Sequence, residues 1–140
     1  MKQLLLLSIF ISITFFSYSQ KRNYQTKKPD IFFVEKSISF GAIIEGKKEN
    51  IHYKFYNSGD APLLLLDVKP SCGCTASKWP REPIMPGDSS EIIASFNSKG
   101  YAGKRTHKSV RVTTNIKEKN GQNKVVILFF KGLVKPKSTK

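Results

Sequence analysis

The sequence predicts an all-β protein, an antiparallel β-sandwich of about seven short strands preceded by a signal peptide. Three observations support this fold class. Short apolar or alternating runs recur along the chain, and turn-forming residues separate them at intervals of about eight to twelve residues. After the N-terminal segment, no stretch shows the 3.6-residue periodicity of an amphipathic helix.

The N-terminal segment has the three parts of a secretory signal peptide, which we place at residues 1–19. Lys2 supplies the positive start, residues 4–16 form the apolar run, and Ser17 and Ser19 are small residues at the cleavage positions. The apolar run is shorter than the roughly 20 residues of a membrane span, so a retained anchor is the less favoured alternative. We expect a mature chain that begins at Gln20, has no membrane span and is periplasmic or secreted.

The charge balance is strongly basic, with 24 Lys and Arg against 10 Asp and Glu in the 140 residues. Cleavage would remove only Lys2 of these and leave a net charge of +13. The lysines are dispersed, which is typical of a solvated surface, although an anionic partner is the alternative. We do not expect nucleic-acid binding, because arginine is scarce and the aromatic residues do not interleave with basic ones in the manner of a stacking platform.

The chain after cleavage predicts one domain, residues 31–135, between a polar leader at 20–30 and a basic tail at 136–140. In the segment IHYKFY, Ile51, Tyr53 and Phe55 alternate with polar residues, so one face is expected to be buried and the other solvated. The other expected strands are 31–34, 37–40, 63–68, 91–96, 110–113 and 125–134.

Turn signals separate these strands. Asn57-Ser58-Gly59-Asp60 combines residues that bond nearby backbone or accept unusual φ values, and Pro86-Gly87 predicts a second tight turn. Glycines flank the connection at 100–103. Asn120-Gly121 predicts the tip of a hairpin whose connection covers residues 116–124.

Several motifs occur in an order that resembles a bacterial secreted family, the domain of unknown function numbered fifteen seventy-three. These are FGAI at 40–43, FYNSGDAPL at 55–63, the Cys-Gly-Cys-Thr signature within PSCGCT at 70–75, WPREPI at 79–84, FNSKG at 96–100 and Thr114-Asn115. The resemblance covers about residues 37–134. It implies an immunoglobulin-like sandwich related to major-sperm-protein and hydin-type domains, which serve as scaffolds or binding modules, and it implies no reaction. The shared positions Asn57, Gly59, Trp79, Pro86 and Gly87 are explained by the fold: backbone bonds, turns and an apolar lid.

Cys72 and Cys74 are the only cysteines of the chain, and they are separated by Gly73. Export would place them in an oxidising compartment, which favours a disulfide. A disulfide needs Cα atoms about 4.4 to 6.8 Å apart, so the backbone must fold at Gly73, and Thr75 follows directly. We expect a local disulfide or a buried thiol pair that stabilises less than a long-range bridge would.

Two chemical alternatives use the same cysteines. One is thiol-disulfide exchange, although no thioredoxin-like context accompanies the pair. The other is copper or zinc handling, with further ligands from His52, His107 or Met85. Strand alternation places both histidines on exposed faces, so we expect no metal site and no cofactor.

No residue pattern predicts an enzyme. Ser71 has no nucleophile motif around it, and Asp60 and Asp88 lie in turns, with Asp67 close to one, where capping explains them. We therefore expect an exported, non-enzymatic binding or structural module of the cell envelope, whose partner is another envelope or extracellular protein. The alternative is a periplasmic thiol redox or metal-handling protein.

Overall fold

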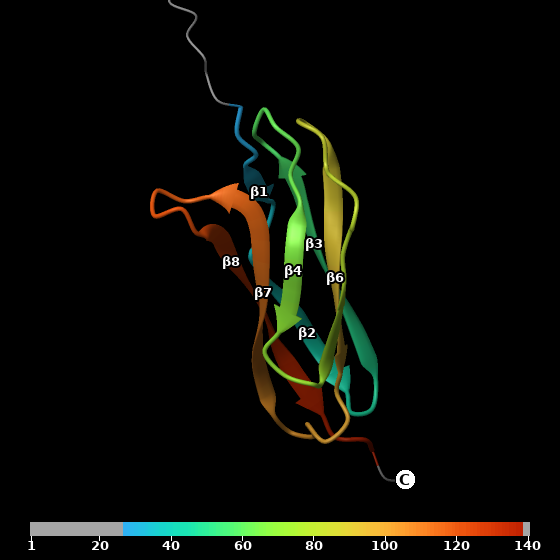
Figure 1. Cartoon of the computed structure of the whole chain (residues 1–140). Coiled ribbons are helices and arrows are strands. Elements are labelled where there is room, and N and C mark those ends of the chain that lie inside the picture. The colour runs from blue at the N-terminus through green and yellow to red at the C-terminus, as the bar shows by residue number, and fades with distance from the viewer. Residues whose placement is uncertain (1–26, 139–140) are drawn as a thin grey trace, which may run out of the picture.

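The computed structural model describes residues 27–138, which form a two-layered β-sandwich (Figure 1). The expected signal peptide, most of the polar leader and the end of the basic tail lie outside these residues. The described part contains strands and no helix, and therefore no helix that is long and apolar enough to cross a membrane. The strands are β1 (Ile31–Phe33), β2 (Ser37–Ile44), β3 (Lys48–Asn57), β4 (Leu65–Pro70), β5 (Thr75–Lys78), β6 (Ser89–Asn97), β7 (Arg105–Lys117) and β8 (Asn123–Lys135).

Each layer is a four-stranded sheet. Sheet I has the order β1-β3-β6-β5 and sheet II the order β2-β8-β7-β4. All neighbouring strands are antiparallel except β2 and β8, which pair in parallel. The parallel pair arises because the chain leaves sheet I after β1, crosses over residues 34–36 and enters sheet II beside the last strand. The predicted sandwich is confirmed, with eight strands and this one parallel pair.

The core lies between the sheets and follows the predicted alternation. In β3, the side chains of Ile51, Tyr53 and Phe55 are buried, whereas His52 and Lys54 are exposed. Burial of large apolar side chains on both inner faces is the main source of stability in such a sandwich.

Every predicted strand is present with different bounds: β2, β3, β6, β7 and β8 are longer than expected, most of all β7, which was expected at 110–113, whereas β1 is one residue shorter and β4 is shifted. The apolar run at 63–68 was expected as one strand, but Leu63 makes an isolated bridge to Ile84 and β4 begins only at Leu65. The side chain and backbone of Asn115 instead bond the backbone of Leu64. β5 was not predicted, because its four residues, TASK, show no apolar alternation. Its place in sheet I comes from antiparallel pairing with β6.

Candidate functional site

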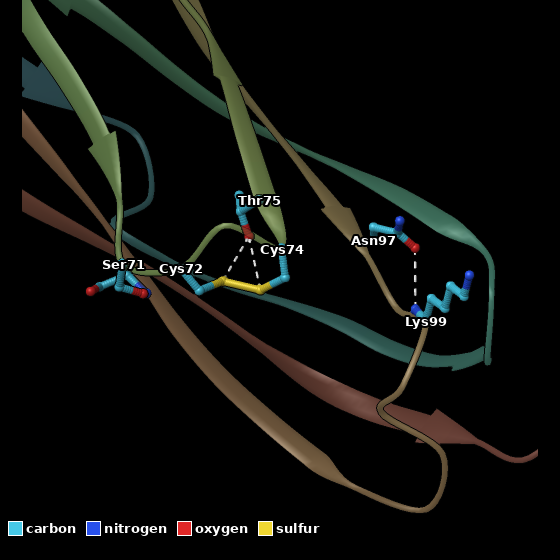
Figure 2. The surroundings of a disulfide bond; sticks show 7 residues. Ser71, Cys72, Cys74, Thr75, Asn97 and Lys99 are labelled. Atoms are coloured by element: carbon cyan, nitrogen blue, oxygen red, sulfur yellow. Dashed lines mark hydrogen bonds between the residues drawn. A yellow bond between two sulfur atoms is a disulfide. The ribbon is translucent and has the colours of Figure 1, made fainter.

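The two cysteines lie in the loop that connects the sheets. This loop leaves β4 of sheet II at Pro70 and enters β5 of sheet I at Thr75 (Figure 2). A disulfide joins Cys72 to Cys74, whose Cα atoms are 5.2 Å apart. The loop is anchored to both sheets: Ser71 N donates to Ser109 O on β7 at 2.8 Å, and Asn97 N on β6 donates to Cys74 O at 2.9 Å. Backbone hydrogen bonds therefore hold the cysteine loop to both sheets at one end of the sandwich.

Thr75 lies beside the disulfide, and Figure 2 shows its hydroxyl oxygen facing both sulfur atoms. Its buried hydroxyl oxygen is 3.6 Å from Cys72 Sγ and 3.8 Å from Cys74 Sγ. Disulfide sulfur atoms carry no hydrogen, so the hydroxyl is the donor, and its one hydrogen points to one sulfur or is shared between the two. Both cysteines are half-buried, so part of the pair is open to solvent.

Gly73 was expected to be the residue whose freedom lets the ring close. Its φ lies outside the left-handed region, and a Cβ built on it would meet no atom within 4 Å. The loop therefore does not need a left-handed glycine here, and this position has room for a side chain.

The residues considered as further metal ligands do not gather at the cysteines. His52 is exposed on sheet I, with Nδ1 3.1 Å from a carboxylate oxygen of Glu91. His107 is exposed on sheet II, where its ring stacks on that of Phe129. Across residues 27–138 no group of three His, Cys, Asp or Glu side chains is placed to hold a metal ion.

Asn57 is the centre of a second cluster, at the opposite end of β6 from Cys74. Its side chain is only 1% exposed. The amide nitrogen donates to Ala61 O at 2.8 Å and Ile84 O at 2.9 Å, and Oδ1 accepts from Gly59 N at 3.0 Å. Asn57 thus joins its own turn to the segment before β6.

The glycines of this cluster have two different roles. Gly87 has a φ of 83° in the turn where Asp88 N donates to Met85 O, and it follows Pro86. Gly59 was also assigned to a turn, but its φ is not positive. A Cβ on Gly59 would collide with the backbone of residues 28–30, which pack directly against it. Close packing of two backbone segments is what requires glycine there.

Trp79 follows β5 and packs against the buried core from its side. The guanidinium carbon of Arg81 lies 3.7 Å from the centre of its ring, a cation–π contact that covers the outer side. Trp79 Nε1 has no hydrogen-bond partner within the described residues. The Trp79 ring is therefore partly buried, with one part against the core and Arg81 over it.

The residues singled out from the sequence do not form one site. The cysteine loop and the Asn57 cluster lie at opposite ends of the sandwich, separated by the length of β6 (Figure 1). The nine residues of β6 span about 30 Å at the usual rise of a strand. Neither cluster can act directly on a ligand bound at the other.

The outer face of sheet II carries a pattern that the sequence reasoning missed. Apolar residues of β8 point outward, and basic residues of β7 lie opposite or next to them: Arg111 pairs with Ile127, and Arg105 with Leu133. We call this surface the β7–β8 face, and its residues are Arg105, His107, Arg111, Val125, Ile127, Phe129, Lys131 and Leu133. The signal was the period-two alternation of both strands, but only the register shows that the two sets adjoin.

The β7–β8 face has little compensating negative charge. Asp67 of the adjacent β4 is the one carboxylate within the outward-facing rows of sheet II, and it pairs with Lys69 at 3.3 Å. Among the described residues, no carboxylate lies within 4 Å of Arg105, Arg111 or Lys131 in an ion pair. The face therefore combines exposed apolar area with uncompensated positive charge.

The family model described as "Protein of unknown function (DUF1573)" matches residues 31–132, which include both clusters and most of the β7–β8 face. The chain belongs to this family. No curated protein matches the DUF1573 chain.

Solved structures with the same fold come from proteins of different kinds. The ASH/PapD-like domain 7 of human CEP192 has a TM-score of 0.60 at 13% identity, covering 87% of the DUF1573 chain and 98% of that domain. The periplasmic chaperone SfaE has a TM-score of 0.51 at 13% identity, covering 78% and 59%. The VesB protease of Vibrio cholerae has a TM-score of 0.56 at 9% identity, covering 76% of this chain and only 32% of VesB. Identities this low show the shared fold alone: a PapD-like, immunoglobulin-like sandwich.

Proposed function

We propose that this protein is an exported, non-enzymatic module of the cell envelope, periplasmic or secreted, that binds another envelope or extracellular protein. The N-terminal sequence pattern supports export. The family match to a domain of unknown function and the likeness to PapD-like domains, among them a periplasmic chaperone, are in keeping with a binding role.

The observation that carries the proposal is the composition of the β7–β8 face. Val125 and Ile127 are 42% and 36% exposed, in a row that Phe129 continues, and Arg111 lies beside them. Exposed apolar side chains that are bordered by arginine are typical of the energetic centre of a protein interface. A solvated outer sheet face would instead carry polar side chains on β8.

The same composition defines the partner. A surface that complements this face must bring apolar side chains to β8 and carboxylates to β7. Its attraction to the net positive chain would be long-range and would weaken as salt shortens the Debye length. The partner is therefore a protein with an acidic surface that also exposes apolar residues.

Site-specific photo-crosslinking in the native envelope tests this function. A photoreactive residue in place of Ile127 should give one discrete adduct with a partner protein, and the charge reversal Arg111→Glu should abolish it. The matched control carries the photoreactive residue in place of Ala76, which is exposed on the outer face of sheet I. Equal adducts from both faces, or an adduct that Arg111→Glu leaves intact, would contradict a binding role for the β7–β8 face.

Export is tested separately by the intact mass of the protein isolated from its envelope. A chain that begins at Gln20 and is released with the periplasmic or extracellular fraction is the expected result. An uncleaved chain that begins at Met1 and stays in the cytoplasmic fraction would remove this part of the proposal.

The disulfide supports a second candidate function, thiol-disulfide exchange. The half-exposed Cys72–Cys74 bond has the Thr75 hydroxyl at both sulfur atoms, and this hydroxyl would donate to a thiolate formed on reduction. In such an exchange two glutathione thiols would lose two electrons and two protons to the Cys72–Cys74 bond and become glutathione disulfide.

Equilibration of the protein in glutathione buffers of different ratios tests this candidate. Redox function requires that the bond responds to the buffer and that Thr75→Val changes the response. If the Cys72–Cys74 bond stays oxidised at every glutathione ratio, its role is structural and the redox candidate is wrong. Titration of the reduced protein with Cu(I) and Zn²⁺ tests metal handling in the same samples, and binding lost in Cys72→Ser, Cys74→Ser would support it.

A further inference from the structure

A basic groove lies at the end of the β7–β8 face where β7 starts and β8 ends, beside the irregular part of β2. The groove has a volume of about 570 Å³ and is lined by Ser39, Gly41, Arg105, His107, Lys131 and Leu133, among others. The pairing of β2 with β8 is interrupted between Ser39 and Ala42, where Gly41 has a φ of 72°. The β-bulge and the small residues Ser39 and Gly41 leave space that a regular strand with larger side chains would fill.

Three cationic or potentially cationic side chains surround this space. His107 on β7 lies directly opposite Lys131 on β8, and Arg105 is two residues further along the same face of β7. Side chains in these positions have Cβ atoms about 5 to 8 Å apart, so their charged ends can reach one group between them. Within residues 27–138, no carboxylate lines the groove.

This arrangement is unfavourable for the unliganded protein. Arg105 pairs with Leu133 and so lies diagonally across the strand pair from Lys131, where the two positive charges repel each other. Neither Arg105 nor Lys131 forms an ion pair with any carboxylate of the described residues. A bound anion would offset this repulsion, and a volume of about 570 Å³ can hold one.

The ring of His107 is also held in a defined orientation. It stacks on Phe129 with ring centres 5.3 Å apart and an angle of 3° between the planes. Stacking occupies a face of the imidazole and leaves the N–H at its edge available to donate. The three residues therefore offer a guanidinium fork, an ammonium group and an imidazole N–H.

We propose that this groove binds a phosphate group carried by a larger molecule. Arginine binds phosphate through two parallel N–H donors, and lysine adds a compact charge, so the set matches a tetrahedral dianion better than a single carboxylate. The volume of the groove is in the range of small-ligand sites and leaves room for the group to which the phosphate is attached. This proposal goes beyond the proposed protein partner, which it does not require.

Titration of the purified mature protein with inorganic phosphate and with glycerol 3-phosphate, followed by amide and side-chain NMR shifts, tests the site. Saturable shifts should centre on Gly41, His107 and Lys131 for both probes. The variant Arg105→Gln, Lys131→Gln should weaken binding by at least about tenfold, because it removes charge-assisted bonds. The control, Lys54→Gln, Lys78→Gln, removes the same charge from the exposed side of sheet I and should leave affinity unchanged within about twofold.

All these side chains are exposed, so neither variant should melt below the parent, and the melting temperature is measured first. Equal weakening by both variants, or shifts spread over the whole surface, would overturn the site and leave only nonspecific attraction. Failure of the crosslinking test at Ile127 would not bear on this result, because the two tests use different residues.

Vesicles distinguish the sources of the phosphate. If the protein floats with vesicles of phosphatidylcholine and phosphatidic acid, but not of phosphatidylcholine alone, and Arg105→Gln, Lys131→Gln prevents this, the phosphate is that of a lipid. If the soluble probes bind in the groove and both kinds of vesicle fail to do so, the phosphate belongs to a soluble molecule. If neither soluble probes nor vesicles bind there, the proposal is wrong.

Discussion

The side-chain amide of Asn57 donates a hydrogen bond to the carbonyl oxygen of Ile84 at 2.9 Å, across 27 residues of sequence. A second bond from the same nitrogen, to Ala61, holds the loop after β3. One buried side chain therefore connects the end of β3 to the segment that leads into β6.

Replacement of Asn57 by Ala is expected to lower the free energy of unfolding by about 3 kcal/mol, because buried backbone groups at three positions lose their partner. Chemical denaturation of the purified protein measures the change. Asn97→Ala is the control, since Asn97 makes a local bond to Lys99 N in an exposed turn, and it should cost less than about 1 kcal/mol. Equal losses would show that Asn57 has no special role.

Two glycine replacements should separate close packing from chain flexibility. Gly59→Ala is expected to cost about 3 kcal/mol or more, because its Cβ would collide with the backbone of residues 28–30, which cannot move as a side-chain end can. Gly73→Ala should cost less than about 1 kcal/mol, because its Cβ would enter open space. Thermal unfolding of the two variants gives the comparison, and a reversed order would refute the geometry given for both loops.

Loss of the disulfide should have a small effect on stability. The Cys72→Ser, Cys74→Ser variant is expected to unfold with less than about 2 kcal/mol of lost free energy, because closing so short a loop restricts the unfolded chain only slightly. The wild-type protein after reduction is the matched sample and should show the same shift. A much larger loss in the variant alone would mean that the serine side chains disturb the contacts of Thr75.

Tyr53 has a hydroxyl group that is buried in the core without a hydrogen-bond partner in residues 27–138. Burial raises the pKa of this phenol above its ordinary value, so it stays neutral at physiological pH. We expect Tyr53→Phe to raise the free energy of unfolding by about 1 kcal/mol, because the buried polar group is removed while the ring is kept. Destabilisation in urea unfolding would instead mean that the hydroxyl has a partner, such as an ordered water.

Asp30 accepts a 3.0 Å hydrogen bond from Lys124 Nζ, between the start of β1 and the start of β8. Partial burial acts to raise the pKa of this carboxyl, but the bonds from Lys124, the Ile31 N–H and Ser58 outweigh it and lower the pKa below the ordinary value of 3.8. A lowered pKa in the folded state means that the interaction stabilises above pH 3.8. The contribution disappears as the pH falls through the folded pKa.

A double-mutant cycle with Asp30→Asn and Lys124→Met measures this contribution. The pair is partly exposed, so the coupling energy at neutral pH should be below about 1 kcal/mol, and it should vanish in strong acid. A coupling that does not change with pH would contradict an ionic interaction.

Much of the fold could be predicted from local patterns. The period-two alternation in 51–56 identified the buried side of β3, and Pro86-Gly87 and Asn120-Gly121 marked turns that the structure contains. β5 escaped prediction because its polar residues take their extended form from pairing with β6, which is distant in sequence. The parallel partner of β2 was equally out of reach, since nothing local distinguishes a strand that remains in its sheet from one that crosses to the other.

The candidate sites show the same division. The sequence by itself determined the cysteine pair, the exposure of both histidines and the excess of basic residues, because each depends on composition or on a neighbour along the chain. Only the tertiary structure decided that Arg105, His107 and Lys131 surround one groove, and that residues 28–30 press against Gly59. The physical reason is that strand register and the crossing between sheets are set by packing across the whole core, and these long-range pairings determine which side chains meet on a surface.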